Sequence, residues 1–323
     1  MSKIRVLITD GLSAELAGLL DADHFQVDVE PTPDDSGLRQ ALDTYDAIAI
    51  RSATRLSADV LQQAGRLRLI VRGGVGVDNI DIAAATARGI AVANTPNANT
   101  VATAELTMAM LLALSRHLVS AHASVAAGKW ERSRFKGVEL FGKTLGLLGF
   151  GRIGREVAAR AQAFGMQTAA YDPYLQESVF QKHQTQTCSL DELLQRSDYL
   201  SLHLPETSDT RQIIGVQALS KVRPGVRIVN CARGGLLDEH AVAAALDSGK
   251  VAGVAVDVYA HEPPGAEHPL VGRPDVIHVP HLGASTAEAQ ARVATEVAQV
   301  IISFFVEKKM TTVLNKEHIQ GTL

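Results

Sequence analysis

Residues 149–154 have the sequence Gly-Phe-Gly-Arg-Ile-Gly and lie between two segments of different predicted structure. The apolar run 144–148 before them is typical of a buried parallel strand, and the segment 153–164 after them has apolar residues at helical spacing. A second predicted strand, 166–171, ends at Asp172. A strand, a glycine turn, a helix, a second strand and an acidic residue, in this order, are typical of a dinucleotide-binding unit.

Each glycine of this turn has a predicted role. Gly149 allows the tight turn, Gly151 lets a ligand approach the backbone, and Gly154 lets the helix pack on the strand. The N–H groups at the start of the helix, at Arg152 and Ile153, are expected to bind the pyrophosphate of the cofactor. Because the chain contains 26 glycines, this spacing alone is weak evidence, and the prediction depends on the flanking strands and the acid.

Asp172 indicates which dinucleotide binds. A carboxylate at the end of the second strand accepts hydrogen bonds from ribose hydroxyls and repels a 2′-phosphate. The following residues, 173–175, contain no Arg or Lys that would neutralise such a phosphate. NAD is therefore predicted rather than NADP. The alternative is that Asp172 is only a turn residue before Pro173.

The composition argues against several other classes of protein. The 323 residues are 46% hydrophobic and carry a formal net charge of −4, which gives no reason to expect nucleic acid or a membrane as partner. Cys188 and Cys231 are too few for a disulfide framework and lack metal-site spacing, so no metal is predicted. The N-terminus has no signal-peptide profile and no apolar run is long enough to span a bilayer. A cytoplasmic location is expected.

The glycine turn lies far from the start of the chain, so a sizeable unit precedes it. Residues 4–71 alternate between strand-like and helix-like segments, and a last amphipathic helix, 286–306, is expected to return to this unit. The predicted fold is α/β with two doubly wound parallel-sheet domains. A Rossmann-like cofactor domain, 99–285, is inserted into a flavodoxin-like substrate domain, 1–98 and 286–323, with the active site in the cleft between them.

Several sequence blocks occur in the same order as in a known family. They are RSAT at 51–54, GGVGVDNID at 73–81, NTPN at 94–97, VNCARGG at 229–235, DVY at 257–259 followed by Glu262-Pro263, and PHLGAST at 280–286. Through these blocks the chain resembles the D-isomer-specific 2-hydroxyacid dehydrogenases over nearly its whole length. WER at 130–132, NCARGG and HLGAST are most similar to the phosphoglycerate dehydrogenase branch. That resemblance implies NAD-dependent oxidation of D-3-phosphoglycerate to 3-phosphohydroxypyruvate, a step of serine biosynthesis.

Three residues match the catalytic positions of this family. His281 follows a predicted strand and Pro280, and an imidazole can both take and return a hydroxyl proton. The resemblance implies that His281 is the acid/base, that Glu262 orients it, and that Arg233 binds the substrate carboxylate with its guanidinium fork. The plain alternatives are a structural loop histidine, a solvated glutamate and an arginine in a structural ion pair.

The resemblance also implies further ligand contacts. Besides the glycine turn and Asp172, the implied cofactor contacts are Val75, Cys231, Ala232, Arg233, Asp257, His281, Gly283 and Ala284. The 73–76 loop offers N–H groups for a carboxylate, and two arginines match positions that contact the phosphate-bearing end. The implied substrate residues are Arg51, Arg72, Gly73, Gly74, Val75, Arg233 and His281. For the two arginines the alternative is a solvated or ion-paired surface position.

Two other functions are considered. A glyoxylate/hydroxypyruvate or D-lactate-type reductase shares the fold but has little use for both Arg51 and Arg72. An NAD-sensing protein similar to the C-terminal-binding corepressors keeps the same catalytic trio, but those proteins usually carry disordered tails. The expected partners are therefore a small phosphorylated 2-hydroxy acid and no nucleic acid or membrane.

A homodimer or tetramer is also expected. The Ala-rich run 100–128 is predicted to be a buried or interface helix, and it resembles the dimer element of the family. Arg132 and Arg134 are expected to complete the pocket of the neighbouring subunit. Many relatives continue into a C-terminal regulatory domain, whereas this chain ends at Leu323, so a naturally short form and a trimmed chain both stay open.

Overall fold

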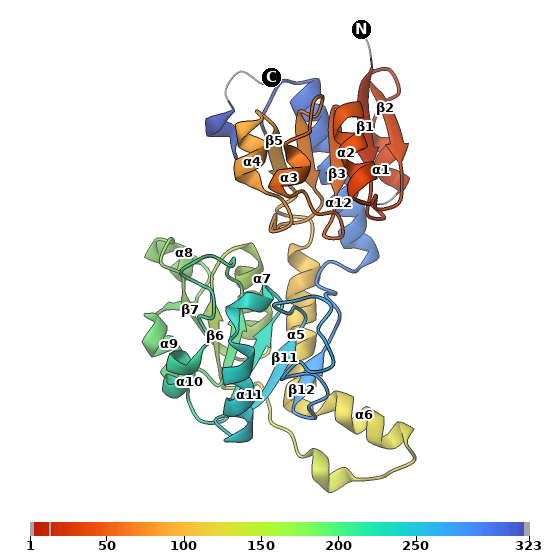
Figure 1. Ribbon diagram of the computed structural model, residues 1–323. Helices are drawn as coiled ribbons and strands as arrows, with labels where there is room; N and C mark the ends of the chain where they lie inside the picture. Colours follow the sequence, from red (N-terminus) through yellow and green to blue (C-terminus); the bar gives the residue numbers. More distant parts are fainter. Residues whose placement is uncertain (1–2, 13, 320–323) are drawn as a thin grey trace. The chain divides into compact units, whose positions relative to one another are not determined.

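Figure 1 shows the computed structural model, which describes residues 3–12 and 14–319. The chain divides into two compact units, one of residues 1–99 and 284–323 and the other of residues 100–283. Each unit is built on its own parallel sheet, of five and seven strands, which confirms the predicted fold class. The predicted substrate domain includes residues 1, 2, 13 and 320–323, which lie outside the described residues.

The unit formed by both ends of the chain has a sheet in the order β2-β1-β3-β4-β5, the flavodoxin-like arrangement. Its strands are β1 (Ile4–Ile8), β2 (Phe25–Val29), β3 (Ala47–Ile50), β4 (Leu69–Arg72) and β5 (Ala91–Asn94). Its helices are α1 (Ala14–Leu19), α2 (Asp35–Thr44), α3 (Ala58–Leu61), α4 (Ile82–Ala87) and α12 (Ala287–Phe305).

Alternating side chains along these strands give this unit two cores, one on each face of the sheet. Val6 and Ile8 of β1 pack with residues of α1 and α12. Leu7, between them in sequence, packs on the other face with residues of α2, α3 and α4. The C-terminal helix α12 therefore completes the core of a unit whose strands all come from the first part of the chain.

The unit of residues 100–283 has a sheet in the order β12-β11-β10-β9-β6-β7-β8. Its strands are β6 (Thr144–Leu148), β7 (Gln167–Tyr171), β8 (Gln186–Thr187), β9 (Tyr199–Leu202), β10 (Val226–Asn230), β11 (Val251–Val256) and β12 (Val276–His278). The chain leaves β6 towards β7 and β8 on one side and later returns to β9 on the other. This reversal of strand order is the position where open α/β sheets bind ligands.

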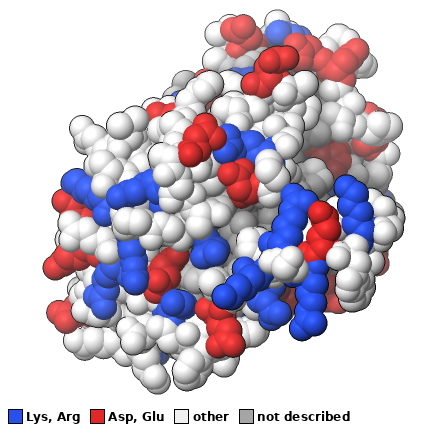
Figure 2. Space-filling model, turned by 90° about the horizontal axis from the view of Figure 1, so that it is seen from below, with Lys and Arg blue, Asp and Glu red and all other residues white. Residues whose placement is uncertain are grey.

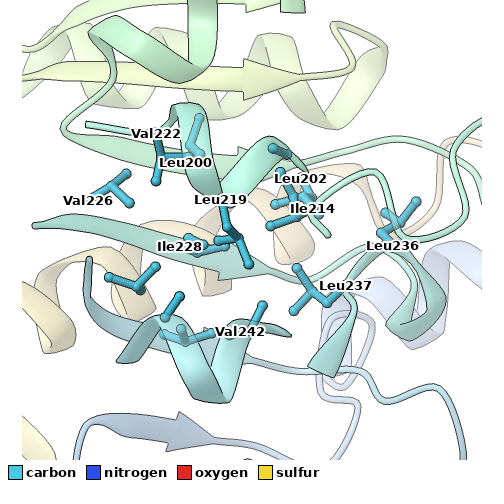
Figure 3. Packing of buried hydrophobic residues seen from close by; sticks show 14 of the residues in the cluster. Leu200, Leu202, Ile214, Leu219, Val222, Val226, Ile228, Leu236, Leu237 and Val242 are labelled. Atoms are coloured by element: carbon cyan, nitrogen blue, oxygen red, sulfur yellow. The ribbon is translucent and has the colours of Figure 1, made fainter. Parts of the chain in front are cut away.

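Apolar side chains cover both faces of this larger sheet. On one face, Leu200 and Ile228 pack with Leu219 of α10 (Val216–Lys221) and Val242 of α11 (Glu239–Asp247), as Figure 3 shows. On the other face, residues of α5 (Thr100–Arg116) and α7 (Arg152–Ala163) cover β6 and its neighbours. Helices α8 (Glu177–Lys182) and α9 (Leu190–Arg196) also belong to this unit.

The predicted single helix in residues 100–128 is wrong in one respect, because two helices are present. His117 has a left-handed backbone (φ 51°) that ends α5 and precedes α6 (Leu118–Ala126). Helix α5 is largely buried, whereas none of the described residues of α6 is buried. Figure 1 shows α6 extending away from the sheet. Across the described part of the chain, no helix combines the length and the apolar character that crossing a membrane requires.

Candidate active site

The glycine turn follows β6 directly, and its three glycines have different surroundings. Gly149 has φ of 91°, and a Cβ there would lie 2.6 Å from the His203 carbonyl oxygen. A Cβ on Gly154 would lie 2.5 Å from the Gly149 carbonyl oxygen, so α7 approaches the turn more closely than a larger residue allows. At Gly151 no described atom lies within 4 Å of such a Cβ, so its backbone faces open space.

Asp172 contacts this turn from the end of β7. Its Oδ2 accepts a hydrogen bond from the Phe150 N–H (2.9 Å), and its Oδ1 accepts one from the Tyr174 N–H (3.1 Å). No described side chain caps the start of α7 at Gly151, which leaves N–H groups for an anion. An open glycine, an uncapped helix start and a carboxylate on the second strand are what the pyrophosphate and ribose of NAD require. The residues present therefore fit this cofactor.

Arg233, Glu262 and His281 follow three neighbouring strands of the same sheet, namely β10, β11 and β12. His281 Nδ1 lies 2.7 Å from Glu262 Oε2. His281 has a left-handed backbone (φ 54°), which costs free energy in a non-glycine residue and has to be stabilised by its surroundings. Its N–H donates to the Asp257 carbonyl oxygen at 2.9 Å. The structure thus brings the imidazole and the carboxylate into direct contact.

Two groups hold the carboxylate of Glu262. Besides the contact with His281, its Oε1 accepts a hydrogen bond from the Tyr259 N–H at 3.1 Å. Burial alone would raise the pKa of Glu262, but the His281 hydrogen bond and charge, the Tyr259 N–H and the Arg233 charge lower it below its usual value. Glu262 therefore stays ionised and can orient an imidazole and stabilise its cation.

Asn230, at the end of β10, fixes the turn that carries Arg233. Its Oδ1 accepts from the Ala232 N–H (3.0 Å), and its Nδ2 donates to the Arg233 carbonyl oxygen (2.8 Å). Arg233 Nη1 donates to the Ala232 carbonyl oxygen at 2.6 Å. The neighbouring Cys231 is buried, and burial raises the pKa of its thiol to about 12. The thiol is thus uncharged, and it lies 3.4 Å from Met110 Sδ.

Asp257 is buried at the end of β11 and organises the loop after His281. Its Oδ1 accepts from the Leu282 N–H (2.5 Å) and its Oδ2 from the Gly283 N–H (2.9 Å). Burial raises the pKa of Asp257, although these N–H groups and the charge of His281 oppose the rise. Both oxygens of the residue expected at the nicotinamide carboxamide therefore already bind backbone groups of this loop.

Five of the predicted substrate residues, Arg51, Arg72, Gly73, Gly74 and Val75, lie in the other unit, at the carboxyl ends of β3 and β4, whereas Arg233 and His281 lie in the unit of residues 100–283. Arg72 Nη1 donates to the Gly73 carbonyl oxygen (3.3 Å) and lies over Gly74, where an added Cβ would meet the guanidinium. Val75 accepts a hydrogen bond from Asn94 Nδ2 at 2.7 Å. Ala284 begins the second segment of this unit.

Asp10 and Asn79, which the sequence analysis did not identify, fix the backbone around Arg51. Asp10 Oδ2 accepts from the N–H groups of Arg51 (2.7 Å) and Thr54 (3.0 Å). Asn79 Nδ2 donates to the carbonyl oxygens of the same two residues, at 2.7 and 2.6 Å. The sequence does show that Asp10 directly follows a predicted strand. It does not show which loop Asp10 binds, because that depends on β1 pairing with β3.

Comparison with known proteins identifies the family. The sequence model of the NAD-binding domain of D-isomer specific 2-hydroxyacid dehydrogenases matches residues 108–283, which is more than half of the chain. The chain belongs to this family. The predicted family and the prediction of an NAD-binding domain are confirmed.

Individual relatives match over most of this chain. D-3-phosphoglycerate dehydrogenase from Bacillus subtilis is 43% identical over 301 residues, and that from Mycobacterium leprae is 47% identical over 296 residues. These matches cover 93% and 92% of this chain but only 57% and 56% of the relatives, so the chain spans little more than half of their length. The crystal structure of a glyoxylate reductase from Paecilomyes thermophila is 32% identical with a TM-score of 0.89, covering 98% of this chain and 100% of that one.

His203 lies half-buried beside the glycine turn and was also missed by the sequence analysis. Its N–H donates to the Leu148 carbonyl oxygen at 2.7 Å, and its Nε2 lies 2.9 Å from Ser201 Oγ. Desolvation of the ring lowers the pKa of His203 to about 3, so the ring is neutral in the folded protein near neutral pH.

The neutral His203 should make stability depend on pH. Below pH 6.5 the unfolded chain protonates this ring while the folded chain does not until about pH 3. The free energy of unfolding should therefore fall as the pH drops from 6.5, by up to about 1.4 kcal/mol per pH unit from this residue. Urea unfolding between pH 7 and 4.5 should give a shallower dependence for His203→Gln than for the parent. The exposed His240→Gln is the control, and equal slopes for all three proteins would contradict the prediction.

Proposed function

We propose that this chain catalyses the NAD-dependent oxidation of D-3-phosphoglycerate to 3-phosphohydroxypyruvate, with His281 as the acid/base. The observation that carries the reaction type is the 2.7 Å contact between His281 Nδ1 and Glu262 Oε2, beside the turn that holds Arg233. The relatives at 43% and 47% identity support the phosphorylated substrate. Arg51 and Arg72 in the unit of the flavodoxin-like sheet are the proposed phosphate contacts, with residues 73–75 offering backbone N–H groups.

The proton chemistry follows from the contacts of the three residues. The Arg233 fork binds the substrate carboxylate and the neighbouring oxygen through two parallel hydrogen bonds. With Nδ1 of His281 turned to Glu262, its Nε2 is the nitrogen that takes the hydroxyl proton. Glu262 stabilises the resulting cation, and in the reverse direction His281 returns the proton. When bound, NAD would supply the acceptor for the hydride that leaves the carbon bearing this hydroxyl.

The proposed cofactor contacts follow the geometry of the larger sheet. The uncapped start of α7 at Gly151, Arg152 and Ile153 receives the pyrophosphate, and Asp172 receives the ribose hydroxyls. The backbone of residues 231–233 and of residues 281–284 is proposed to contact the remaining part of the NAD molecule. The cytoplasmic location stays a prediction.

Phosphate recognition distinguishes this proposal from a second candidate, a glyoxylate or hydroxypyruvate reductase, which the full-length match to such an enzyme favours. Two charge-assisted contacts to phosphate are worth about 3 kcal/mol, so kcat/KM should be roughly 100-fold higher for 3-phosphohydroxypyruvate than for hydroxypyruvate. The measurement is NADH consumption by the purified chain on both substrates. Arg51→Gln should lower only the value for the phosphorylated substrate. Equal kcat/KM on both substrates would favour the reductase.

The fork of Arg233 is tested by replacing it with a single ammonium group. Arg233→Lys keeps the charge but loses one of two parallel hydrogen bonds, so kcat/KM should fall roughly 10- to 100-fold. The melting temperature should stay within a few degrees of the parent. NAD binding, followed by calorimetry, should also persist. Normal turnover in this variant would remove Arg233 from the mechanism.

We also propose that the chain forms a homodimer through α6. This helix exposes Leu118, Val119 and Val125, and Trp130 beyond it is 83% exposed. Figure 2 views the molecule from below and shows Lys and Arg side chains spread over this face with acidic ones among them. The short helix η1 (Arg132–Phe135), which follows Trp130, is itself basic. An apolar helix left open to water in one copy is typical of a surface that a second copy covers.

The dimer proposal is tested by sedimentation. The parent should sediment as a dimer or a larger even assembly, and the double variant Leu118→Glu, Val125→Glu as a monomer. Unchanged far-UV circular dichroism would show that the variant is folded. A parent that is monomeric at micromolar concentration would overturn the proposal.

A further inference from the structure

We propose that Glu239 is a positioning residue, which holds the Tyr259–Ala260 peptide and thereby sets the geometry of both Glu262 and the Arg233 turn. The inference rests on the proposed function, because it concerns residues assigned to that reaction. Glu239 itself lies in the first turn of α11 and touches none of the three proposed catalytic side chains through a described hydrogen bond.

Glu239 uses both carboxylate oxygens. Its Oε1 accepts a hydrogen bond from the Ala260 N–H at 3.2 Å, and its Oε2 lies 2.9 Å from His268 Nε2. The carboxylate is only 15% exposed, and the first turn of a helix favours a negative charge. The Glu239 side chain is therefore held in one place and can act as a fixed acceptor for the Ala260 peptide.

His268 faces Glu239 with its Nε2. The Leu270 N–H donates to His268 Nδ1 at 3.2 Å, so the ring proton is on Nε2, the nitrogen nearest the carboxylate. The two atoms are close but not aligned as in a good hydrogen bond, so the attraction is mainly electrostatic. His268 thus steadies the carboxylate without cancelling its charge.

The ring of Tyr259 anchors the other end of the same peptide. It is buried, its hydroxyl lies 3.0 Å from His278 Nδ1, and its face stacks on the ring of His278 at 6.4 Å. The ring of His268 meets it edge to face at 5.4 Å. With the side chain fixed on one side and Ala260 on the other, the Tyr259 N–H has a fixed direction. This N–H is the donor to Glu262 Oε1.

The same peptide also supports the turn of Arg233. A Cβ on Gly234 would lie 1.9 Å from the Tyr259 carbonyl carbon and 2.3 Å from the Ala260 nitrogen, so the two backbones are in contact. A shift of the peptide would therefore move Gly234 and, with it, the adjacent Arg233. One carboxylate on α11 consequently affects the placement of both the substrate-binding fork and the partner of His281.

Because Ala260 is exposed, water can replace Glu239 as the acceptor of its N–H at little cost in stability. Removing Glu239 should instead change the position of the Tyr259–Ala260 peptide. A looser Tyr259 N–H would stabilise the Glu262 carboxylate less, and the pKa of Glu262 would rise. The other charged or titratable groups that act on Glu262 are His281 and Arg233, and it in turn acts on Asp257 and Tyr259. Glu239 is itself among the charges that raise the pKa of Tyr259, so its substitution also acts on that phenol, which stays neutral.

The test compares the parent with Glu239→Ala and the conservative Glu239→Gln. The alanine variant should lose about tenfold in kcat, with the KM for NAD unchanged. The acid limb of its kcat/KM profile should move to higher pH by about half a unit. Glu239→Gln keeps an oxygen for the Ala260 N–H and should recover most of the activity. Parent-like kinetics in Glu239→Ala, or a loss that follows a drop in melting temperature with an unmoved pH profile, would overturn the proposal.

A second readout does not require turnover and so separates this inference from the proposed function. Ring nitrogen NMR of the intact chain follows protonation of the Glu262–His281 pair with pH. Its midpoint should lie at higher pH in Glu239→Ala than in the parent and be restored in Glu239→Gln. An unmoved midpoint overturns the role of Glu239 even in an inactive chain, whereas an inactive parent with a shifted midpoint in the variant overturns only the proposed reaction.

Discussion

The parallel register of the larger sheet is the constraint on which the candidate site depends. Leu148 and Asn230, the last residues of β6 and β10, both pair with Leu202 at the end of β9. Val256, the last residue of β11, pairs with Asn230 and with His278. The residues that follow these strands therefore leave the sheet side by side, although they come from distant parts of the sequence. A glycine turn, an arginine, a carboxylate and a histidine become neighbours for this reason alone.

A strand-end carboxylate ties several of these loops to the next strand. Asp172 after β7 binds an N–H of the loop after β6, and Asp257 after β11 binds two N–H groups of the loop after β12. Asp10 after β1 does the same for the loop that carries Arg51 after β3. Backbone N–H groups at the end of a parallel sheet have no ladder partner, and an adjacent carboxylate satisfies them. The loops are thereby rigid before a ligand arrives, which reduces the cost of ordering them.

The parts of the site that could be predicted from the sequence are those formed by residues close together in the chain. The glycine turn has its three glycines within six positions, and His281 stands in a block that resembles a whole family. The cross-strand ties could not be predicted, because Asp10 and Arg51 meet only through the pairing of β1 with β3. Nor does an Ala-rich run signal that His117 will adopt a left-handed backbone and divide it. Tertiary contacts decide such positions, and local propensity does not.

Three carboxylates lie around Tyr259. Asp257, Glu239 and Glu262 all act on the Tyr259 hydroxyl, and burial together with their charges raises its pKa, so the phenol stays neutral. Each of the three carboxylates accepts at least one backbone N–H, which stabilises a negative charge without adding a mobile proton. Glu262 and Glu239 each also contact an imidazole, of His281 and His268, and the pKa of Glu262 is lowered whereas burial raises that of Asp257. Glu262 is thus suited to stay ionised beside His281 and to stabilise the imidazole cation without taking the proton itself.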